Sequence, residues 1–166
     1  MAQQLLPVAL VVTAGFVSAH SWADMANGTV TFTSKAGVVA LDMKYAYLVK
    51  GPDAISGQPA RRIVLATTDT SAKITACKSM LSCPGGDFDS GMTIDFDVGP
   101  RMNFWLVGKG QRIQYSGGAK PETFALTADT PQRLAGKWQL DERTYDGPLI
   151  DVEFDATVSK EIPALK

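Results

Sequence analysis

Hydrophobic and polar residues alternate along most of this chain, and that alternation constrains the fold more than any other feature. One predicted strand places five apolar or aromatic side chains on a single face: Val39, Leu41, Met43, Tyr45 and Tyr47. The intervening Asp42 and Lys44 point the other way. Because successive side chains of a strand face opposite sides, this pattern predicts one face in a core and one in water, as in antiparallel sheets.

Three further segments have the same pattern: residues 92–98, 134–140 and 150–158. In the first of them, four apolar residues share the predicted core face: Met92, Ile94, Phe96 and Val98. The polar residues between them are expected on the solvent face: Thr93, Asp95 and Asp97.

Five shorter strands are predicted between these segments, at residues 29–33, 63–67, 102–107, 112–115 and 123–127. Gly108-Lys109-Gly110 and Gly117-Gly118 are typical of tight hairpin turns, and Asp146-Gly147-Pro148 is expected to end a strand. Many short strands at this spacing predict an all-β domain, namely an antiparallel β-sandwich of immunoglobulin-like architecture.

One segment has a helical period. Between Thr70 and Leu81, the side chains of Ile74, Cys77 and Leu81 fall on one stripe, with Asp69 or Thr70 as the candidate N-cap. The chain has two cysteines, Cys77 and Cys83, which we expect to form a disulfide in an oxidising compartment. So short a loop gives a stabilisation of about 2 kcal/mol in the loop-entropy description.

The first 23 residues contain no Asp, Glu, Lys or Arg and include an apolar run from Leu5 to Val17. This composition predicts a signal peptide, residues 1–23, with cleavage after Ala19 or Ala23 and a single domain over residues 24–166. The alternative is a membrane anchor, but the run is shorter than the roughly 20 apolar residues that a spanning helix needs. The protein is therefore expected to be periplasmic or secreted, with no transmembrane segment after cleavage.

The balance of 16 basic and 17 acidic residues gives a formal net charge of −1. A nucleic-acid partner is not expected, because binding to phosphates needs a basic face. Arg61 and Arg62 form no more than a pair, and we interpret them as the solvated start of a strand.

Two candidate metal sites follow from the sequence. His20, the single histidine, would become the N-terminal residue after cleavage at Ala19 and could bind copper through its amine and imidazole. The pattern resembles the start of copper monooxygenases with a histidine brace, but no second histidine exists here. Asp87 and Asp89, followed by Gly91, could begin a calcium loop. Otherwise no cofactor is expected.

Catalytic motifs are scarce. With His20 near the terminus or removed, the chain has no plausible Ser-His-Asp or Cys-His arrangement. Asp151, Glu153 and Asp155 alternate along one predicted strand and could supply paired carboxylates to a hydrolase, but such a row is normally the wet face of a sheet. Trp105 lies opposite Phe104 on its strand, and an exposed tryptophan could stack on a sugar or anchor a partner.

Several predicted strand segments are similar to segments of other exported proteins: Gly28–Phe32, Lys44–Tyr47, Arg62–Asp69, Ala135–Trp138 and Asp151–Ala156. With them the chain resembles small uncharacterised exported β-proteins of Gram-negative bacteria, a resemblance that implies no activity or site. The leading hypothesis is a non-enzymatic exported binding module with a protein or glycan partner in the envelope. The alternatives are a metal-handling protein for copper or calcium, a secreted inhibitor of proteases or lysozyme, and a carboxylate-dependent hydrolase.

Overall fold

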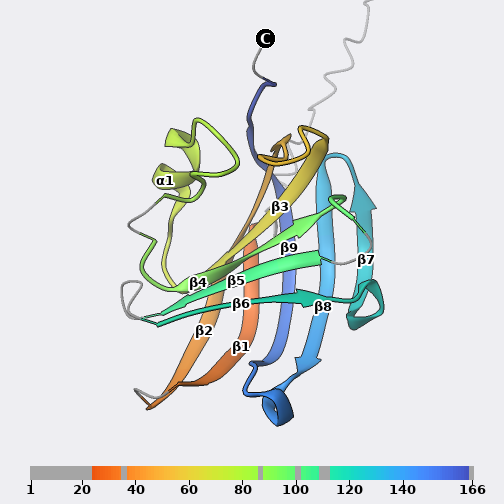
Figure 1. Cartoon of the computed structure of the whole chain (residues 1–166). Coiled ribbons are helices and arrows are strands. Elements are labelled where there is room, and N and C mark those ends of the chain that lie inside the picture. The colour runs from red at the N-terminus through yellow and green to blue at the C-terminus, as the bar shows by residue number, and fades with distance from the viewer. Residues whose placement is uncertain (1–23, 35–36, 86–87, 100–101, 109–112, 165–166) are drawn as a thin grey trace, which may run out of the picture.

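The computed structural model describes residues 24–34, 37–85, 88–99, 102–108 and 113–164 (Figure 1). These residues confirm the all-β class and the single short α-helix. In chain order the elements are β1 (Met25–Ser34), β2 (Gly37–Pro52), β3 (Pro59–Ala66), α1 (Ser71–Ala76), β4 (Gly91–Phe96), β5 (Met102–Gly108), β6 (Ile113–Ala119), β7 (Phe124–Thr130), β8 (Arg133–Asp141) and β9 (Leu149–Glu161). Two short 3₁₀ turns, Pro121–Thr123 and Arg143–Tyr145, precede β7 and β9.

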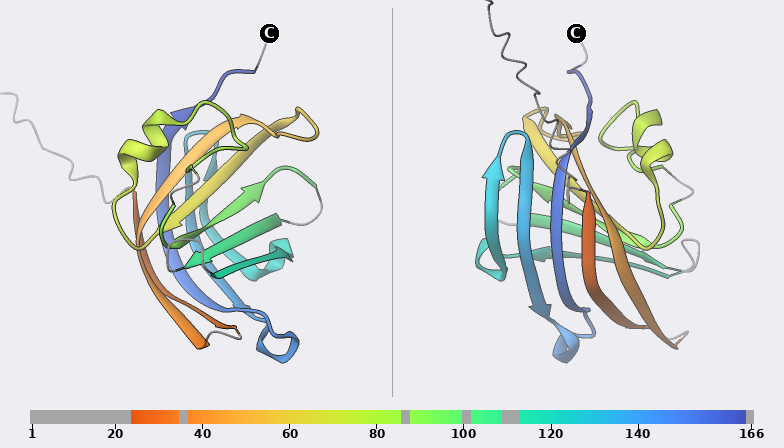
Figure 2. Two further views of the ribbon diagram at one scale, coloured as in Figure 1. Left: turned by 60° about the vertical axis from the view of Figure 1, so that its left-hand side comes forward. Right: turned by 180° about the vertical axis from the view of Figure 1, so that it is seen from behind.

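All nine strands belong to one sheet, in the order β6-β5-β4-β3-β2-β1-β9-β8-β7. Neighbours in this order pair in antiparallel fashion, and β2 also pairs in parallel with β9 at Leu48 and Val158. The sheet curls into a half-barrel, as Figure 2 shows from two further sides. The predicted immunoglobulin-like sandwich is not confirmed, because the strands form one continuous sheet in place of two separate ones.

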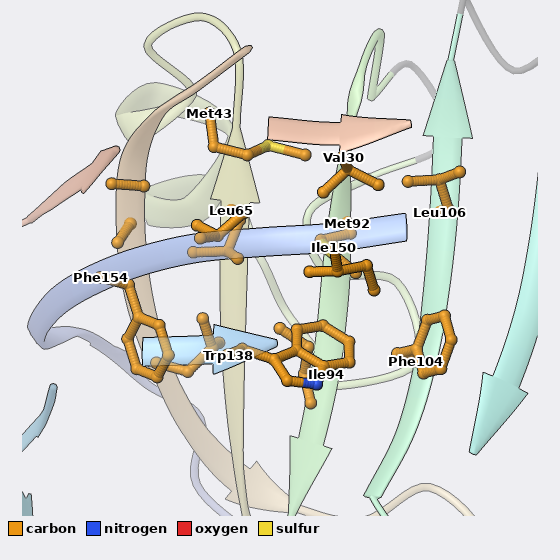
Figure 3. Packing of buried hydrophobic residues seen from close by; sticks show 14 of the residues in the cluster. Val30, Met43, Leu65, Met92, Ile94, Phe104, Leu106, Trp138, Ile150 and Phe154 are labelled. Atoms are coloured by element: carbon orange, nitrogen blue, oxygen red, sulfur yellow. The ribbon is translucent and has the colours of Figure 1, made fainter. Parts of the chain in front are cut away.

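The concave side of the curled sheet holds the main core. In Figure 1, β4, β5 and β6 cross in front of β9 and β8, so that the two ends of one sheet face each other. Phe104 of β5 and Trp138 of β8 meet edge to face with ring centroids 5.2 Å apart (Figure 3). Phe124 of β7 stacks on Trp138 at 4.7 Å. The contact between Phe104 and Trp138 joins the two ends of the sheet, and Phe124 extends the aromatic cluster along β7.

The predicted inward faces of β8 and β9 are confirmed. Leu134 and Trp138 of β8 lie in the core, and so do four residues of β9: Ile150, Val152, Phe154 and Ala156. On the outer face of β9, Asp151 is exposed and forms an ion pair with Lys137 of β8 at 2.9 Å. The two-residue period was sufficient here, because both strands are regular and have one wet face.

The prediction for β2 is wrong beyond Met43. Met43 and Ala46 both face the main core, whereas Tyr45 and Tyr47 pack into a second cluster on the convex face. Since Met43 and Ala46 are three residues apart, the alternation changes phase between them. The change occurs where β2 reaches the end of its pairing with β1, at Tyr45, and continues beside β9.

The second cluster lies between the convex face of β2 and β3 and the segment that carries α1. Its buried residues include Val49, Val64, Ile74 and Phe88. The helix ends at Ala76, five residues before the predicted end at Leu81, because the backbone at Cys77 turns to an extended conformation (ψ 133°). Leu81 therefore leaves the predicted stripe and is 80% exposed.

Thr70, one of the two candidate N-caps, occupies the N-cap position of α1, and Asp69 directly precedes it. Asp69 Oδ1 accepts a hydrogen bond from the backbone N–H of Ser71 at 2.8 Å, while Thr70 makes no side-chain capping bond. Asp69 Oδ1 also accepts the hydroxyl hydrogen bond of Tyr47 at 2.8 Å. The Asp69 carboxylate thus ties the start of the helix to β2.

Gly117 and Gly118 do not form the predicted hairpin turn. Both lie inside β6, where Gly117 is the pairing partner of Phe104. A Cβ atom at position 117 would lie 2.7 Å from Phe104 Cζ, so a side chain there would displace the buried ring. The glycine therefore serves close packing, a role that its turn-like sequence context conceals.

Candidate binding groove

A groove of about 530 Å³ opens on the convex face over β3, β4 and β5. We call it the Trp105 groove. Its lining includes Asp53 and Ile55 from the β2–β3 loop, Leu81 from the disulfide segment, and three strand residues: Arg62, Asp95 and Trp105. Its volume is within the range of ligand sites in proteins.

An ion pair between Arg62 of β3 and Asp95 of β4 forms the floor. Arg62 Nε donates to Asp95 Oδ1 at 2.6 Å, and Arg62 Nη2 donates to Asp95 Oδ2 at 2.8 Å. Both side chains are largely buried, with 12% and 7% of their surface exposed. The two-point geometry fixes the orientation of the guanidinium plane.

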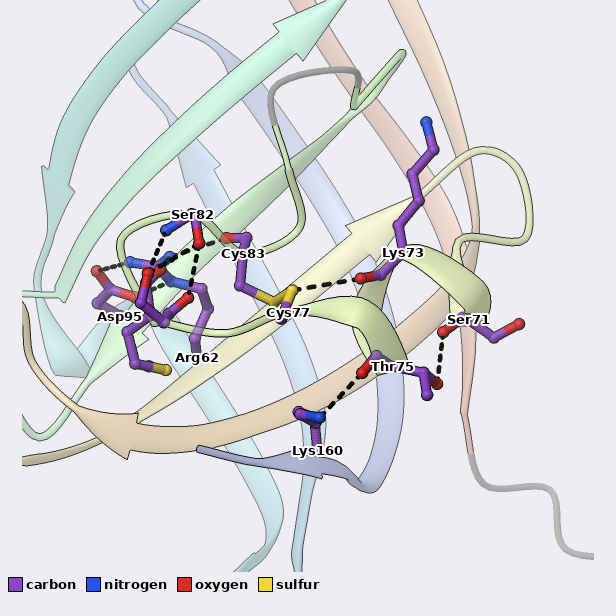
Figure 4. The surroundings of a disulfide bond; sticks show 11 residues. Arg62, Ser71, Lys73, Thr75, Cys77, Ser82, Cys83, Asp95 and Lys160 are labelled. Atoms are coloured by element: carbon purple, nitrogen blue, oxygen red, sulfur yellow. Dashed lines mark hydrogen bonds and ion pairs between the residues drawn. A yellow bond between two sulfur atoms is a disulfide. The ribbon is translucent and has the colours of Figure 1, made fainter. Parts of the chain in front are cut away.

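The same guanidinium group holds the wall of the groove. Arg62 Nη1 donates to the carbonyl oxygens of Met80 and Cys83, the latter at 2.9 Å (Figure 4). The predicted disulfide between Cys77 and Cys83 is confirmed and closes this segment covalently. Arg62 therefore attaches the wall to the sheet, while the disulfide cross-links the wall within itself.

The rim of the groove is apolar and exposed. Ile55 is 98% exposed, Leu81 80% and Trp105 41%. They are three of the seven large hydrophobic residues that the described part of the chain exposes, and all three line this one groove. Arg62 Cζ lies 5.9 Å from the centroid of the Trp105 ring, on the edge of cation–π range. Such a gathering of exposed apolar side chains is typical of an interaction site.

A tight turn presents Ile55. Asp53 Oδ2 accepts hydrogen bonds from the backbone N–H of Ser56 at 2.7 Å, from the backbone N–H of Ile55 at 3.1 Å and from the hydroxyl of Ser56 at 2.8 Å. These bonds, above all the one from the Ser56 backbone, lower the pKa of Asp53 below its ordinary value. The carboxylate therefore stays ionised while it orders the loop.

Sequence reasoning found part of this groove. It singled out Trp105, which lies opposite the buried Phe104 as predicted. It placed Thr93 and Asp95 on a wet face, which is wrong: both are buried. It interpreted Arg62 as a solvated residue at the start of a strand and did not connect it with a groove. The strand register pairs Arg62 with Asp95, and a charged pair on adjacent predicted strands was the one signal that could have suggested the contact.

Of the three candidate metal ligands, the structure describes one. Asp89 is exposed, while Asp87 and His20 lie outside the described residues. Across the described ranges, no group of three or more His, Cys, Asp or Glu side chains could hold a metal ion. The predicted leader, residues 1–23, with both cleavage sites, likewise lies outside the described residues.

The row of carboxylates on β9 faces basic side chains. Asp151 pairs with Lys137, and Asp155 pairs with Arg133 at 2.6 Å. These ion pairs raise the pKa of Lys137 and of Arg133, chiefly through their hydrogen bonds to the carboxylates. The row therefore works as an ion-paired outer face of β8 and β9.

A second hollow of about 610 Å³ lies at one end of the half-barrel, where β2, β3, β7 and β9 meet. Its charged groups pair with each other. Arg61 donates to Asp97 and to Asp129, and Lys50 pairs with Glu161 at 2.7 Å. These contacts join segments that are distant in sequence, so we assign the charged groups of this hollow to structure.

A comparison of the chain with protein-family models, with curated proteins and with solved structures found no match. Among the described residues, no helix has the length and apolar character that crossing a membrane would require.

Proposed function

We propose that this chain is a non-enzymatic binding module of the periplasm or the extracellular space, and that the Trp105 groove is its contact surface. The observation that carries the proposal is the convergence of Ile55, Leu81 and Trp105, all exposed, on a groove with a fixed floor and wall. Tryptophan is among the residues that supply most of the binding energy of interfaces when a partner buries them.

The state of the ionisable groups favours binding over acid–base chemistry. Arg62 and Asp95 direct their hydrogen bonds to each other and to backbone carbonyls of the wall. A general acid or base must reach the substrate with its proton-carrying atom. A salt-bridged pair with so little exposed surface is better suited to holding the groove in shape.

Export is supported by the disulfide and by the predicted leader. A cross-link such as Cys77–Cys83 persists in oxidising compartments and is rare in the reducing cytosol. Because Cys83 belongs to the wall of the groove, the same bond that indicates the compartment also shapes the proposed contact surface.

Site-specific photo-crosslinking in the source organism tests the proposal. A benzophenone side chain is placed at Leu81, on the rim, and separately at Leu126, an exposed residue of β7 that does not line the groove. We expect a crosslinked adduct from position 81, lost in Trp105→Ala, and none from position 126. No adduct from position 81, or the same adduct from both positions, would refute the groove as the contact surface.

A further inference from the structure

We infer that the occupant of the Trp105 groove is a protein segment that places a bulky apolar side chain beside a lysine or an arginine. The inference rests on the proposed function and names the partner of the same site. Two features support it. The first is the apolar rim over a floor whose charged groups bond to each other, and the second is the charge of Asp53, which forms no ion pair with another described residue.

The apolar side chain of the partner is inferred from the groups of the groove that can still contact a ligand. A sugar needs side-chain donors and acceptors for its hydroxyl groups. Arg62 and Asp95, the charged groups of the floor, are bonded to each other and to the wall. The hydroxyl groups of Ser82, in the wall, and Ser79 form a hydrogen bond of 2.8 Å with each other. The most exposed large side chains of the lining are hydrocarbon and indole, which are stabilised when another apolar side chain covers them.

The aliphatic rim points to a protein in particular. Ile55 and Leu81 are more exposed than Trp105 and line the same groove. Branched aliphatic side chains have no flat face for stacking on a pyranose ring, but they pack well around an aliphatic or aromatic side chain. A partner that inserts such a side chain would contact the indole and be enclosed by the two rim residues.

The lysine or arginine of the partner is inferred from the charged residues that line the groove. Among the described residues, three charged residues line the groove, and Arg62 neutralises Asp95. Asp53 is the remaining one, and within the described part of the chain it belongs to no ion pair. Hydrogen bonds from Ser56 keep the pKa of its carboxyl group below the ordinary value, so the charge persists at neutral pH. A partner with a cation beside its apolar anchor therefore complements the groove, and this term steers association.

The test begins with a library of random displayed peptides, from which those that bind the full chain are selected. The affinity of the selected peptides for purified variants of the protein is then measured. We expect enriched sequences with an aromatic or branched apolar residue adjacent to Lys or Arg. Trp105→Ala should weaken their binding by about tenfold or more, since buried tryptophans are dominant anchors. Asp53→Asn should weaken it by about threefold and reduce its dependence on salt.

Matched controls separate the groove from the general surface. Leu126→Ala removes an exposed apolar side chain outside the groove, and Asp42→Asn removes an exposed carboxylate outside it. Both are expected to leave the affinity unchanged. A panel of soluble oligosaccharides is titrated in parallel, with the same variants.

The outcomes distinguish this inference from the proposed function. Trp105-dependent binding of oligosaccharides without peptide binding would overturn the protein partner and leave the groove as a binding site. Enriched peptides without a cation, or an affinity insensitive to Asp53→Asn, would overturn the cationic part. If no probe binds in a Trp105-dependent manner while Leu81 still gives a crosslink, the inference fails alone; if that crosslink is also missing, both proposals fail.

Discussion

Arg61 and Arg62 are neighbours on β3, and their side chains point to opposite faces of the sheet. Arg61 donates to Asp97 at 2.5 Å and to Asp129 of β7 at 2.6 Å, which ties β3 to the far end of the curled sheet. These carboxylates, Asp97 first, raise the pKa of Arg61. Arg62 binds Asp95 and the wall of the Trp105 groove. The pair expected as a solvated start of a strand is thus 17% and 12% exposed, and that expectation is wrong.

Replacing Arg62 by methionine should destabilise the protein strongly. The change leaves Asp95 as a buried charge without a partner, and breaking buried pairs in this way costs about 3–5 kcal/mol. Urea denaturation of Arg62→Met measures the free energy of unfolding. The double variant with Asp95→Leu should recover much of the loss, because it removes the stranded charge.

Arg143→Met is the matched control for that experiment. Its partner Asp141, at 2.6 Å, is exposed, and both side chains keep half or more of their surface in water. A surface pair of this kind contributes about 0–1 kcal/mol. Equal losses from Arg62→Met and Arg143→Met would contradict the structural role assigned to Arg62.

Removing the disulfide should open the wall of the groove. The double variant Cys77→Ser with Cys83→Ser is expected to lose about 2 kcal/mol of stability, because the closed loop is short. Trypsin cleavage after the exposed Lys78 should become faster in the variant or under reducing conditions. An unchanged cleavage rate would contradict the role of the disulfide in holding the wall of the groove closed.

Tyr47 should make a pH-dependent contribution to the free energy of unfolding, and the surroundings of its hydroxyl group determine the sign. Burial, followed by the hydrogen bond to Asp69, raises the pKa of the Tyr47 hydroxyl above 10.0. The folded state therefore retains the proton more strongly than the unfolded state. The contribution to stability is fully present below pH 10 and is lost as the pH rises through the folded-state pKa.

Tyr47→Phe removes the donor to Asp69 and the acceptor of the Thr70 backbone N–H, which lies 3.0 Å away. We expect a loss of about 1–3 kcal/mol at neutral pH and a smaller difference from the wild type above pH 10. Denaturation series at several pH values measure both. Tyr145→Phe, at an 84% exposed position, should change neither, and a constant difference between Tyr47→Phe and wild type across the pH range would refute the assignment.

Phe104→Ala should weaken the contact between the two ends of the sheet. The ring is fully buried against Trp138 and lies 5.9 Å from Tyr115 of β6, centroid to centroid. Truncation of a buried phenylalanine typically costs about 3–5 kcal/mol, including the cavity that remains. Thermal and urea unfolding measure the loss, with Val38→Ala at a 62% exposed site as the control, expected within about 0.5 kcal/mol of wild type.

Strand positions were predictable where the local pattern and the tertiary environment agree. All nine predicted strands overlap strands of the structure, and the core faces of β8 and β9 are as expected. The prediction failed at Tyr45 and Tyr47, where β2 changes phase, and at Asp95, where a covering segment buries the face expected in water. In both places the cause is a contact with residues distant in sequence.

By itself, the sequence determined which segments are extended, where a disulfide could form and that Trp105 lies opposite the core residue Phe104. These properties depend on the two-residue period of strands and on local spacing. Only the tertiary structure decided that one sheet curls on itself, that Arg62 and Asp95 become buried and that Ile55, Leu81 and Trp105 line one groove. The physical reason is that curvature and coverage depend on packing between distant segments, which a local pattern does not encode.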